Sequence, residues 1–130
     1  MTRDGRNLDT FPGFAVGIVM TTRPFPYTRT SVSEPIGLPI LFEGDLTERD
    51  HAHLHFAEVG LEGGQLVTAG YHGWTMVVTG TGPTIAEAQA DAYRLVRRVV
   101  IPDVRYRNDI GAKLIAGDFQ CLERLGLLQD

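Results

Sequence analysis

Three histidines stand at every second position in the stretch HAHLHF, which runs from His51 to Phe56. Side chains alternate between the two faces of a β-strand, so a strand here would place all three on one face, as in the beginning of a zinc site. Residues two apart on a flat strand are roughly 7 Å apart, too far for three side chains to reach one ion without a sharp bend. The pattern therefore favours histidines hydrogen-bonded on a sheet, and a metal site of His51, His53 and His55 is the weaker alternative.

Motifs for nucleotide binding or covalent catalysis are missing from the sequence. It contains no GxxxxGK[ST] loop, no GxSxG and no HExxH. The glycine-rich stretch TGTGPT lacks the third glycine of a dinucleotide fingerprint. Thr84 and Glu87 occupy the helix start that follows, where a carboxylate would repel phosphate. We expect no catalytic residue and no cofactor bound by this chain alone.

Length and composition restrict the class of protein. The 130 residues are the size of one domain, and twelve basic against sixteen acidic residues disfavour a nucleic-acid partner. Cys121 is the single cysteine, which excludes an internal disulfide and favours a reducing compartment. The longest apolar run, Phe14 to Met20, is too short to cross a membrane, and Met1 to Asp9 lacks a signal-peptide core. We expect one cytoplasmic domain, 1–130, without a membrane partner.

Strands are predicted mainly in the first part of the chain. In GFAVGIVM, bulky residues alternate with small ones, which indicates a strand with one buried face. The stretch from Thr21 to Phe42 is rich in proline and reads as a long excursion. QLVTAG and WTMVVTG are predicted to form a hairpin joined through Tyr71, His72 and Gly73.

The period changes to helical from Ile85 onward. Thr84 and Glu87 form a capping-box pattern, and Pro102 marks the end of the segment. A terminal helix is expected between Ile115 and Leu128. The predicted class is α+β, a small antiparallel sheet or partial barrel with one main helix (Ile85 to Val99) and a short C-terminal helix.

Four segments, FAVGIVM, QLVT, MVVTGTGPTIAEAQADAY and YRNDIG, resemble in this order the C-terminal domain of phosphoribosylamine–glycine ligase, also called glycinamide ribonucleotide synthetase. The resemblance covers about Gly13 to Leu114, which leaves 115–130 as a C-terminal extension. It implies a small sheet that closes over an ATP-grasp site in purine biosynthesis. In that superfamily ATP and Mg²⁺ are bound N-terminal to this domain, so both would come only through an ATP-grasp partner.

The resemblance also points to individual residues. His55 matches the histidine of the family's Phe-His-Ala-Gly-Thr segment, whereas His51 and His53 match no family histidine. Arg107, Asp109 and Gly111 are retained within YRNDIG. These four residues are either structural or substrate-facing. The structural interpretation is preferred, with Arg107 paired to Asp109 and Gly111 in a tight turn.

Three loops depart from the family. A glycine-rich turn is replaced by residues 22–27, which keep an aromatic-Pro pair and lose the glycines. The family's Ala-Gly-Thr becomes Phe56, Ala57 and Glu58. A Gly-Gly-Arg loop becomes about two residues longer, with Trp74 where the arginine would be.

Two functions follow from these observations. The chain is either a ligase domain, excised or docking on an ATP-grasp partner without a complete active site of its own, or a diverged binding and oligomerisation module. The lack of ATP-grasp residues before the first strand favours the second hypothesis, while the first remains the assignment that the resemblance implies. A ligase domain is expected to meet its partner at Tyr71, Trp74 and Arg107. A module is expected to use an apolar contact patch of Phe25, Tyr27 and Trp74.

Overall fold

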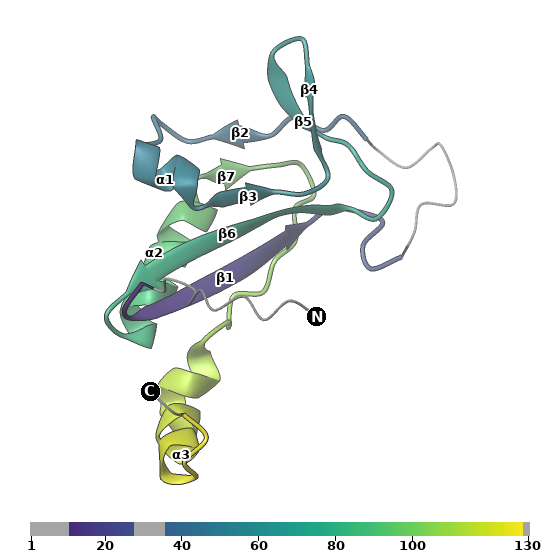
Figure 1. Cartoon of the computed structure of the whole chain (residues 1–130). Coiled ribbons are helices and arrows are strands. Elements are labelled where there is room, and N and C mark those ends of the chain that lie inside the picture. Colours follow the sequence, from purple (N-terminus) through teal and green to yellow (C-terminus); the bar gives the residue numbers. More distant parts are fainter. Residues whose placement is uncertain (1–10, 28–35, 129–130) are drawn as a thin grey trace, which may run out of the picture.

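A three-stranded antiparallel sheet in the order β1-β6-β3 organises the fold (Figure 1). The computed structural model describes residues 11–27 and 36–128. The strands of this sheet are β1 (Phe14–Thr21), β6 (Trp74–Gly82) and β3 (Leu54–Phe56). Two shorter antiparallel pairs join β2 (Leu41–Phe42) to β7 (Val99–Val100) and β4 (Val59–Glu62) to β5 (Gln65–Thr68).

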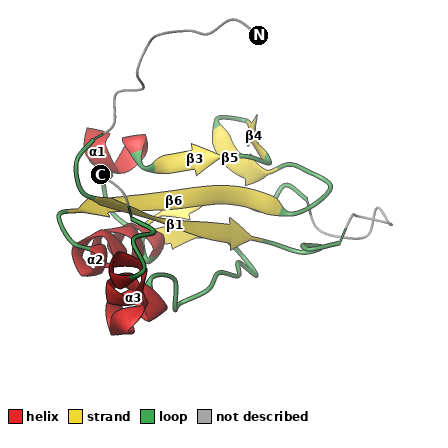
Figure 2. Ribbon diagram, turned by 60° about the horizontal axis from the view of Figure 1, so that its bottom comes forward, coloured by secondary structure: helices red, strands yellow, loops and turns green. Residues whose placement is uncertain are grey.

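The main helix, α2 (Ile85–Val96), covers one face of the sheet (Figure 2). A short helix, α1 (Glu48–Ala52), precedes β3. The C-terminal helical segment consists of η1 (Leu114–Asp118), which is kinked at Gly117 where φ is +136°, and α3 (Phe119–Arg124). Within the described ranges, no helix is long and apolar enough to span a bilayer. The predicted α+β class with a small antiparallel sheet and few helices is confirmed.

The core lies between the sheet and α2. Val16, Ile18 and Met20 of β1 are buried, while the residues between them face the other way, so the predicted period-2 pattern is confirmed. They meet buried side chains from β6 and α2: Met76, Val78, Ala88, Ala92, Leu95 and Val96. Because the first residues that α2 buries are alanines, its backbone can approach the strands closely.

The predicted end of the main helix is wrong. The helix begins as expected, because the Thr84 hydroxyl accepts a hydrogen bond from the amide of Glu87 and donates one to its carboxylate. It ends at Val96 rather than Val99. Val99 and Val100 are β-branched and favour extended backbone, and they pair with β2 as β7.

The predicted hairpin is also wrong. β5 pairs with β4 through the two-residue turn Gly63-Gly64, where both residues have positive φ, as a tight hairpin requires. β6 pairs instead with β1 and β3. The predicted excursion from Thr21 to Phe42 lies partly outside the described residues, and the polar segment from Met1 to Asp9 lies wholly outside them. The second described part of the excursion, residues 36–42, contains β2.

A single strand through HAHLHF is contradicted. His51 belongs to α1, His53 follows its last residue and only His55 lies in β3. The reason is a capping box in which Thr47 and Asp50 each accept a hydrogen bond from the other's backbone amide. Because α1 occupies the first part of the stretch, the three histidines do not share a strand face.

Candidate functional site

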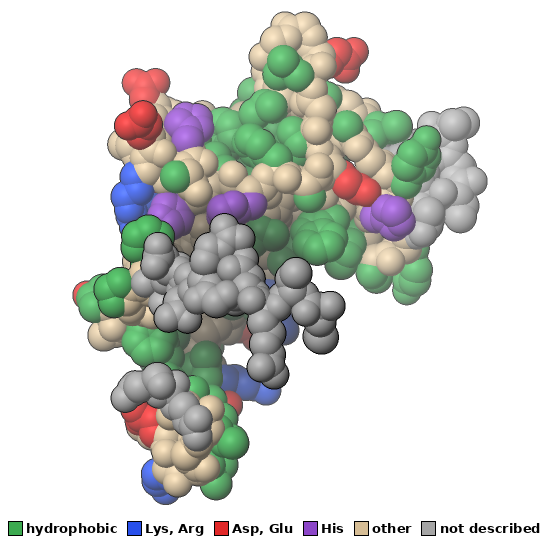
Figure 3. Space-filling view, viewed as in Figure 1, with side chains coloured by type: hydrophobic (Ala, Val, Ile, Leu, Met, Phe, Trp, Pro, Cys, Tyr) green, Lys and Arg blue, Asp and Glu red, His purple; other side chains and the backbone are tan. Residues whose placement is uncertain are grey.

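The histidines do not converge on a common point. His51 is exposed on α1, whereas Nδ1 of His53 and Nε2 of His55 lie 2.8 and 3.0 Å from the Thr79 hydroxyl on β6. Figure 3 shows histidine side chains on the side of the molecule that carries α1. In residues 11–27 and 36–128, no three His, Cys, Asp or Glu side chains are grouped to hold a metal ion. His53 and His55 therefore attach β3 to β6 through a shared hydroxyl.

The retained YRNDIG segment is fastened to α2. The Arg107 guanidinium donates two hydrogen bonds, of 2.9 and 2.7 Å, to the Asp109 carboxylate. The Tyr93 hydroxyl donates to the carbonyl of Arg107 and accepts from the amide of Ile110. Gly111 has a φ of +87°, which glycine adopts without strain. The Arg107 and Asp109 side chains are mostly exposed, so their pair contributes little to stability.

The three loops that depart from the family meet at one end of the sheet. The amide of Thr22 donates to the carbonyl of Gly73 at 2.8 Å, and the amide of Glu58 donates to the carbonyl of Trp74 at 3.0 Å. Gly73 has a φ of +76°, and a side chain there would collide with the carbonyl of Thr22. Residues 22–27, 56–58 and 71–74 are here called the loop cluster. His55 and Gly111 lie outside it. The structure thus brings the changed segments together, whereas Arg107 and Gly111 lie beside α2.

Glu58 is the centre of the loop cluster. Its carboxylate accepts hydrogen bonds from the amides of Gly73 at 2.7 Å, His72 at 3.1 Å and Trp74 at 3.2 Å, and Nδ1 of His72 lies 3.0 Å away. Successive amides that point at one anion form a nest. Burial alone would raise the pKa of Glu58, but the hydrogen bonds from His72, Gly73 and Trp74 outweigh it and hold that pKa below its usual value. The carboxylate is therefore ionised, and it occupies the anion site that the amides of His72, Gly73 and Trp74 form.

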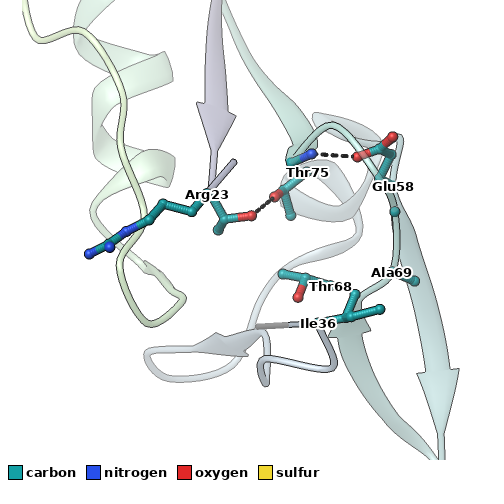
Figure 4. Close-up of a pocket in the computed structure, with 9 residues that line it drawn as sticks. Arg23, Ile36, Glu58, Thr68, Ala69 and Thr75 are labelled. Atoms are coloured by element: carbon teal, nitrogen blue, oxygen red, sulfur yellow. Dashed lines mark hydrogen bonds between the residues drawn. The ribbon is translucent and has the colours of Figure 1, made fainter. Parts of the chain in front are cut away.

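Little space remains inside the loop cluster (Figure 4). The cavity among these loops has a volume of about 10 Å³, room for roughly one water molecule. Across it, the Thr22 and Thr75 hydroxyls lie 3.3 Å apart and share a hydrogen bond. Gly70 is needed beside the cavity, because a Cβ there would collide with the carboxyl group of Glu58. This cavity is therefore too small for a substrate, and a wider open hollow of about 480 Å³ adjoins it, with Gly70 and Tyr71 among its walls.

Four aromatic side chains, here called the aromatic rim, are carried by the same loops. Tyr27 and Tyr71 are 75% and 68% exposed, and Trp74 and Phe25 are 48% and 40% exposed. The loops that carry them are joined by the bond between Thr22 and Gly73. Large aromatic side chains that remain exposed are typical of contact surfaces.

Sequence reasoning missed the role of Glu58, although both parts of the signal were visible. By the family resemblance, Glu58 stands where the family has a threonine, and the loop that it binds is about two residues longer than the family's. In the sequence alone the two departures are unconnected. The structure connects these two departures, because the backbone amides of the longer loop need a hydrogen-bond acceptor and the Glu58 carboxylate supplies it.

Glu58→Thr, which restores the family residue, is expected to lower the free energy of unfolding by about 1–3 kcal/mol. Three backbone amides lose their acceptor, and the shorter side chain does not reach them. Urea unfolding measures the loss, and hydrogen exchange should speed up at His72, Gly73 and Trp74. Glu62→Thr, at an exposed glutamate on β4, is the control and should change stability by less than about 0.5 kcal/mol. Equal effects of the two substitutions would remove the special role of Glu58.

Comparison with known proteins gives a consistent result. Residues 15–113 match the family described as Phosphoribosylglycinamide synthetase, C domain. The chain is 34% identical over 101 residues to phosphoribosylamine–glycine ligase of Streptomyces coelicolor, covering 76% of this chain and 23% of that protein. The corresponding ligase of Vibrio vulnificus is 30% identical over 110 residues, covering 84% of this chain and 24% of that protein.

A solved structure supports the same assignment. The crystal structure of phosphoribosylamine–glycine ligase from Thermotoga maritima has 32% sequence identity and a TM-score of 0.58, covering 75% of this chain and 22% of that one. The chain thus spans about a quarter of the length of the curated relatives that it matches. The family match covers most of the chain, and the β1-β6-β3 sheet with α2 is its fold. This chain belongs to the phosphoribosylglycinamide synthetase C-domain family.

Proposed function

We propose that this domain closes over the active site of a phosphoribosylamine–glycine ligase-like enzyme and shapes one side of it. In this proposal an ATP-grasp partner domain binds ATP and Mg²⁺ and supplies the groups that activate a carboxylate by phosphorylation. The domain contributes a surface and no catalytic residue. His55, Arg107, Asp109 and Gly111 hold the scaffold, and the loop cluster around Glu58 faces the partner.

The observation that carries the proposal is the meeting of the three changed loops at one end of the sheet. Their cavity holds about one water molecule, whereas a substrate pocket usually needs several hundred Å³. A surface of this kind works only when a second surface completes it. The exposed aromatic rim next to the cavity supports such a contact.

Glu58 adds a statement about the ligand. Backbone amides that point at one spot can bind a phosphate, but here the carboxylate already occupies them. We therefore propose that these loops do not contact a substrate phosphate and that the partner domain binds it.

A chimera tests the proposal. Residues 13–130 of this chain would replace the matching segment of the Streptomyces coelicolor ligase. We expect glycine-dependent ADP formation above that of the ligase shortened by the same segment. Trp74→Ala in the chimera should lower kcat/KM by roughly tenfold or more, the usual loss for a central aromatic contact. Val100→Ala, at a half-exposed valine on β7, is the control and should leave kcat/KM nearly unchanged.

Two results would contradict the proposal. One is a folded chimera that is no more active than the shortened ligase. The other is glycine-dependent ADP formation by this chain alone.

The second candidate is a binding or oligomerisation module without a ligase role. The exposed side chains of the aromatic rim favour it, since large exposed aromatic side chains often mark contact surfaces. A module would leave the chimera inactive, and the isolated chain would associate through Trp74.

A further inference from the structure

In the described part of the chain, the outer edge of β1 is paired with none of the other strands. β1 is the first strand in the order β1-β6-β3, and within residues 11–27 and 36–128 its other side meets an extended segment only at the bridge between Thr21 and Arg105. Proteins usually protect a long edge strand with charge, proline or a covering element. The strand FAVGIVMT has neither a charged residue nor a proline. Such an edge is a template for pairing with another strand.

The bonding direction along this edge can be derived. The amide and carbonyl of Thr21 bond to Arg105 at 2.9 and 2.8 Å, on the side away from β6. The amide of Thr22 points to the other side, toward Gly73. Because backbone groups alternate along a strand, the amides and carbonyls of Val19, Gly17 and Ala15 also point outward.

Side-chain shape differs between the two halves of the strand. Val19 is 42% exposed on the sheet face opposite α2. Beside the other half, Phe14 to Gly17, an apolar hollow of about 290 Å³ lies between β1 and the C-terminal segment, with Leu114, Phe119 and Leu122 among its walls. Figure 2 shows α3 next to the end of the sheet where β1 begins, and the rings of Phe14 and Phe119 are 5.4 Å apart. One strand thus carries a protruding valine and an apolar hollow.

We infer that two copies of this chain pair through the outer edges of β1, antiparallel and about a two-fold axis at Gly17. Val19 of each copy then lies opposite Ala15 of the other copy, beside the apolar hollow of that other copy. Each outward-pointing pair exchanges two N–H···O bonds. A two-fold contact requires a surface that is complementary to itself, and β1 meets this condition without bringing like charges together. The sheet becomes continuous through both copies.

Val19→Lys tests the pairing, because a lysine on an edge strand opposes strand addition. Sedimentation equilibrium of the full chain should show a dimer for the wild type. The dissociation constant of Val19→Lys should be higher by a factor of at least about ten. Val100→Lys is the matched control, because Val100 is a valine of equal exposure, 41%, on β7. It should leave the dissociation constant unchanged.

Hydrogen exchange of the wild-type chain gives a second test that needs no variant. Protection of the Ala15, Gly17 and Val19 amides should rise with protein concentration, while the amides of Val16 and Ile18 stay protected throughout. A wild type that is monomeric up to millimolar concentration would overturn the inference. So would a dimer that Trp74→Ala dissociates and Val19→Lys does not. The inference does not depend on the proposed function, which concerns the opposite end of β1.

Discussion

Gly80→Ala is expected to lower the free energy of unfolding by about 3 kcal/mol or more, a large part of the stability of an ordinary domain. Gly80 lies on β6 where α2 crosses it. A Cβ at this position would be 2.6 Å from the carbonyl oxygen of Ala88 and would collide with the backbone nitrogen of Ala92. Because the obstacles are backbone atoms of a helix, no side-chain rotation relieves them, and α2 must move away from the core.

Gly17→Ala is the matched control for this prediction. Gly17 lies on the neighbouring strand, on the sheet face opposite α2, and a Cβ there would come no closer than 3.5 Å, to a methyl group of Val77. Alanine also restricts the unfolded chain more than glycine, so stability should stay equal or rise by up to about 1 kcal/mol. Urea unfolding followed by circular dichroism measures both variants. Similar losses for the two would show that α2 does not pack closely on Gly80.

The glycines of TGTGPT illustrate what sequence reasoning can and cannot separate. Their spacing resembles part of a nucleotide-binding loop, but the third glycine of the dinucleotide-binding pattern is missing. In the structure Gly80 and Gly82 instead give α2 room, since a Cβ at Gly82 would be 2.7 Å from the amide nitrogen of Ala88. Close approach of a helix and binding of a phosphate both require glycine. Only the position of α2 decides between them.

Features with local causes were predictable. The alternation in β1 and the Thr84 cap of α2 depend on residues a few positions apart. The strand pairing was not, because β6 bonds to β1, which lies about 60 residues earlier, and the sequence around Tyr71 fits a hairpin loop equally well. The Gly63-Gly64 turn was the stronger hairpin signal. The Thr47 and Asp50 capping box was a local signal too, and the alternation of the histidines obscured it.

The candidate site was predictable only in part. Comparison with the family identified which segments differ, and the structure shows that they touch. That Glu58 binds the longer loop is visible only in the three-dimensional structure, since Glu58 and Gly73 are separated by β4 and β5 in the sequence. A residue that satisfies a distant loop leaves no periodic pattern in the sequence.

Asp50→Asn is expected to lower the melting temperature by roughly 5–10 °C at neutral pH. The Asp50 side chain is only 4% exposed, and it joins α1 to the guanidinium group of Arg94 on α2 at 2.7 Å and to that of Arg98, just after α2, at 3.3 Å. It also accepts hydrogen bonds from the amide and hydroxyl of Thr47. Asparagine removes the charge that both arginines face. Asp109→Asn, which breaks the exposed pair with Arg107, is the control and should shift the melting temperature by no more than about 2 °C.

Asp50 and a second carboxylate, that of Asp91 on α2, should make stability fall in acid. The Arg94 guanidinium and the Thr47 amide hold the pKa of Asp50 far below the ordinary 3.8, and Arg49 lowers the pKa of Asp91 to about 2. A depressed pKa means that the unfolded chain binds protons first as the pH falls. The stabilisation is therefore complete above the unfolded value of 3.8, and for Asp91 it is lost between 3.8 and about 2. For Asp50 the loss extends to lower pH.

Urea unfolding at a series of pH values between neutral and strongly acid checks this dependence. The free energy of unfolding of the wild type should decrease below a pH of about 4, and that of Asp50→Asn should decrease less steeply, because one depressed carboxyl group has been removed. Parallel curves for the two proteins would mean that Asp50 titrates alike in both states, and its ion pairs with α2 would then contribute nothing to the acid sensitivity of the fold.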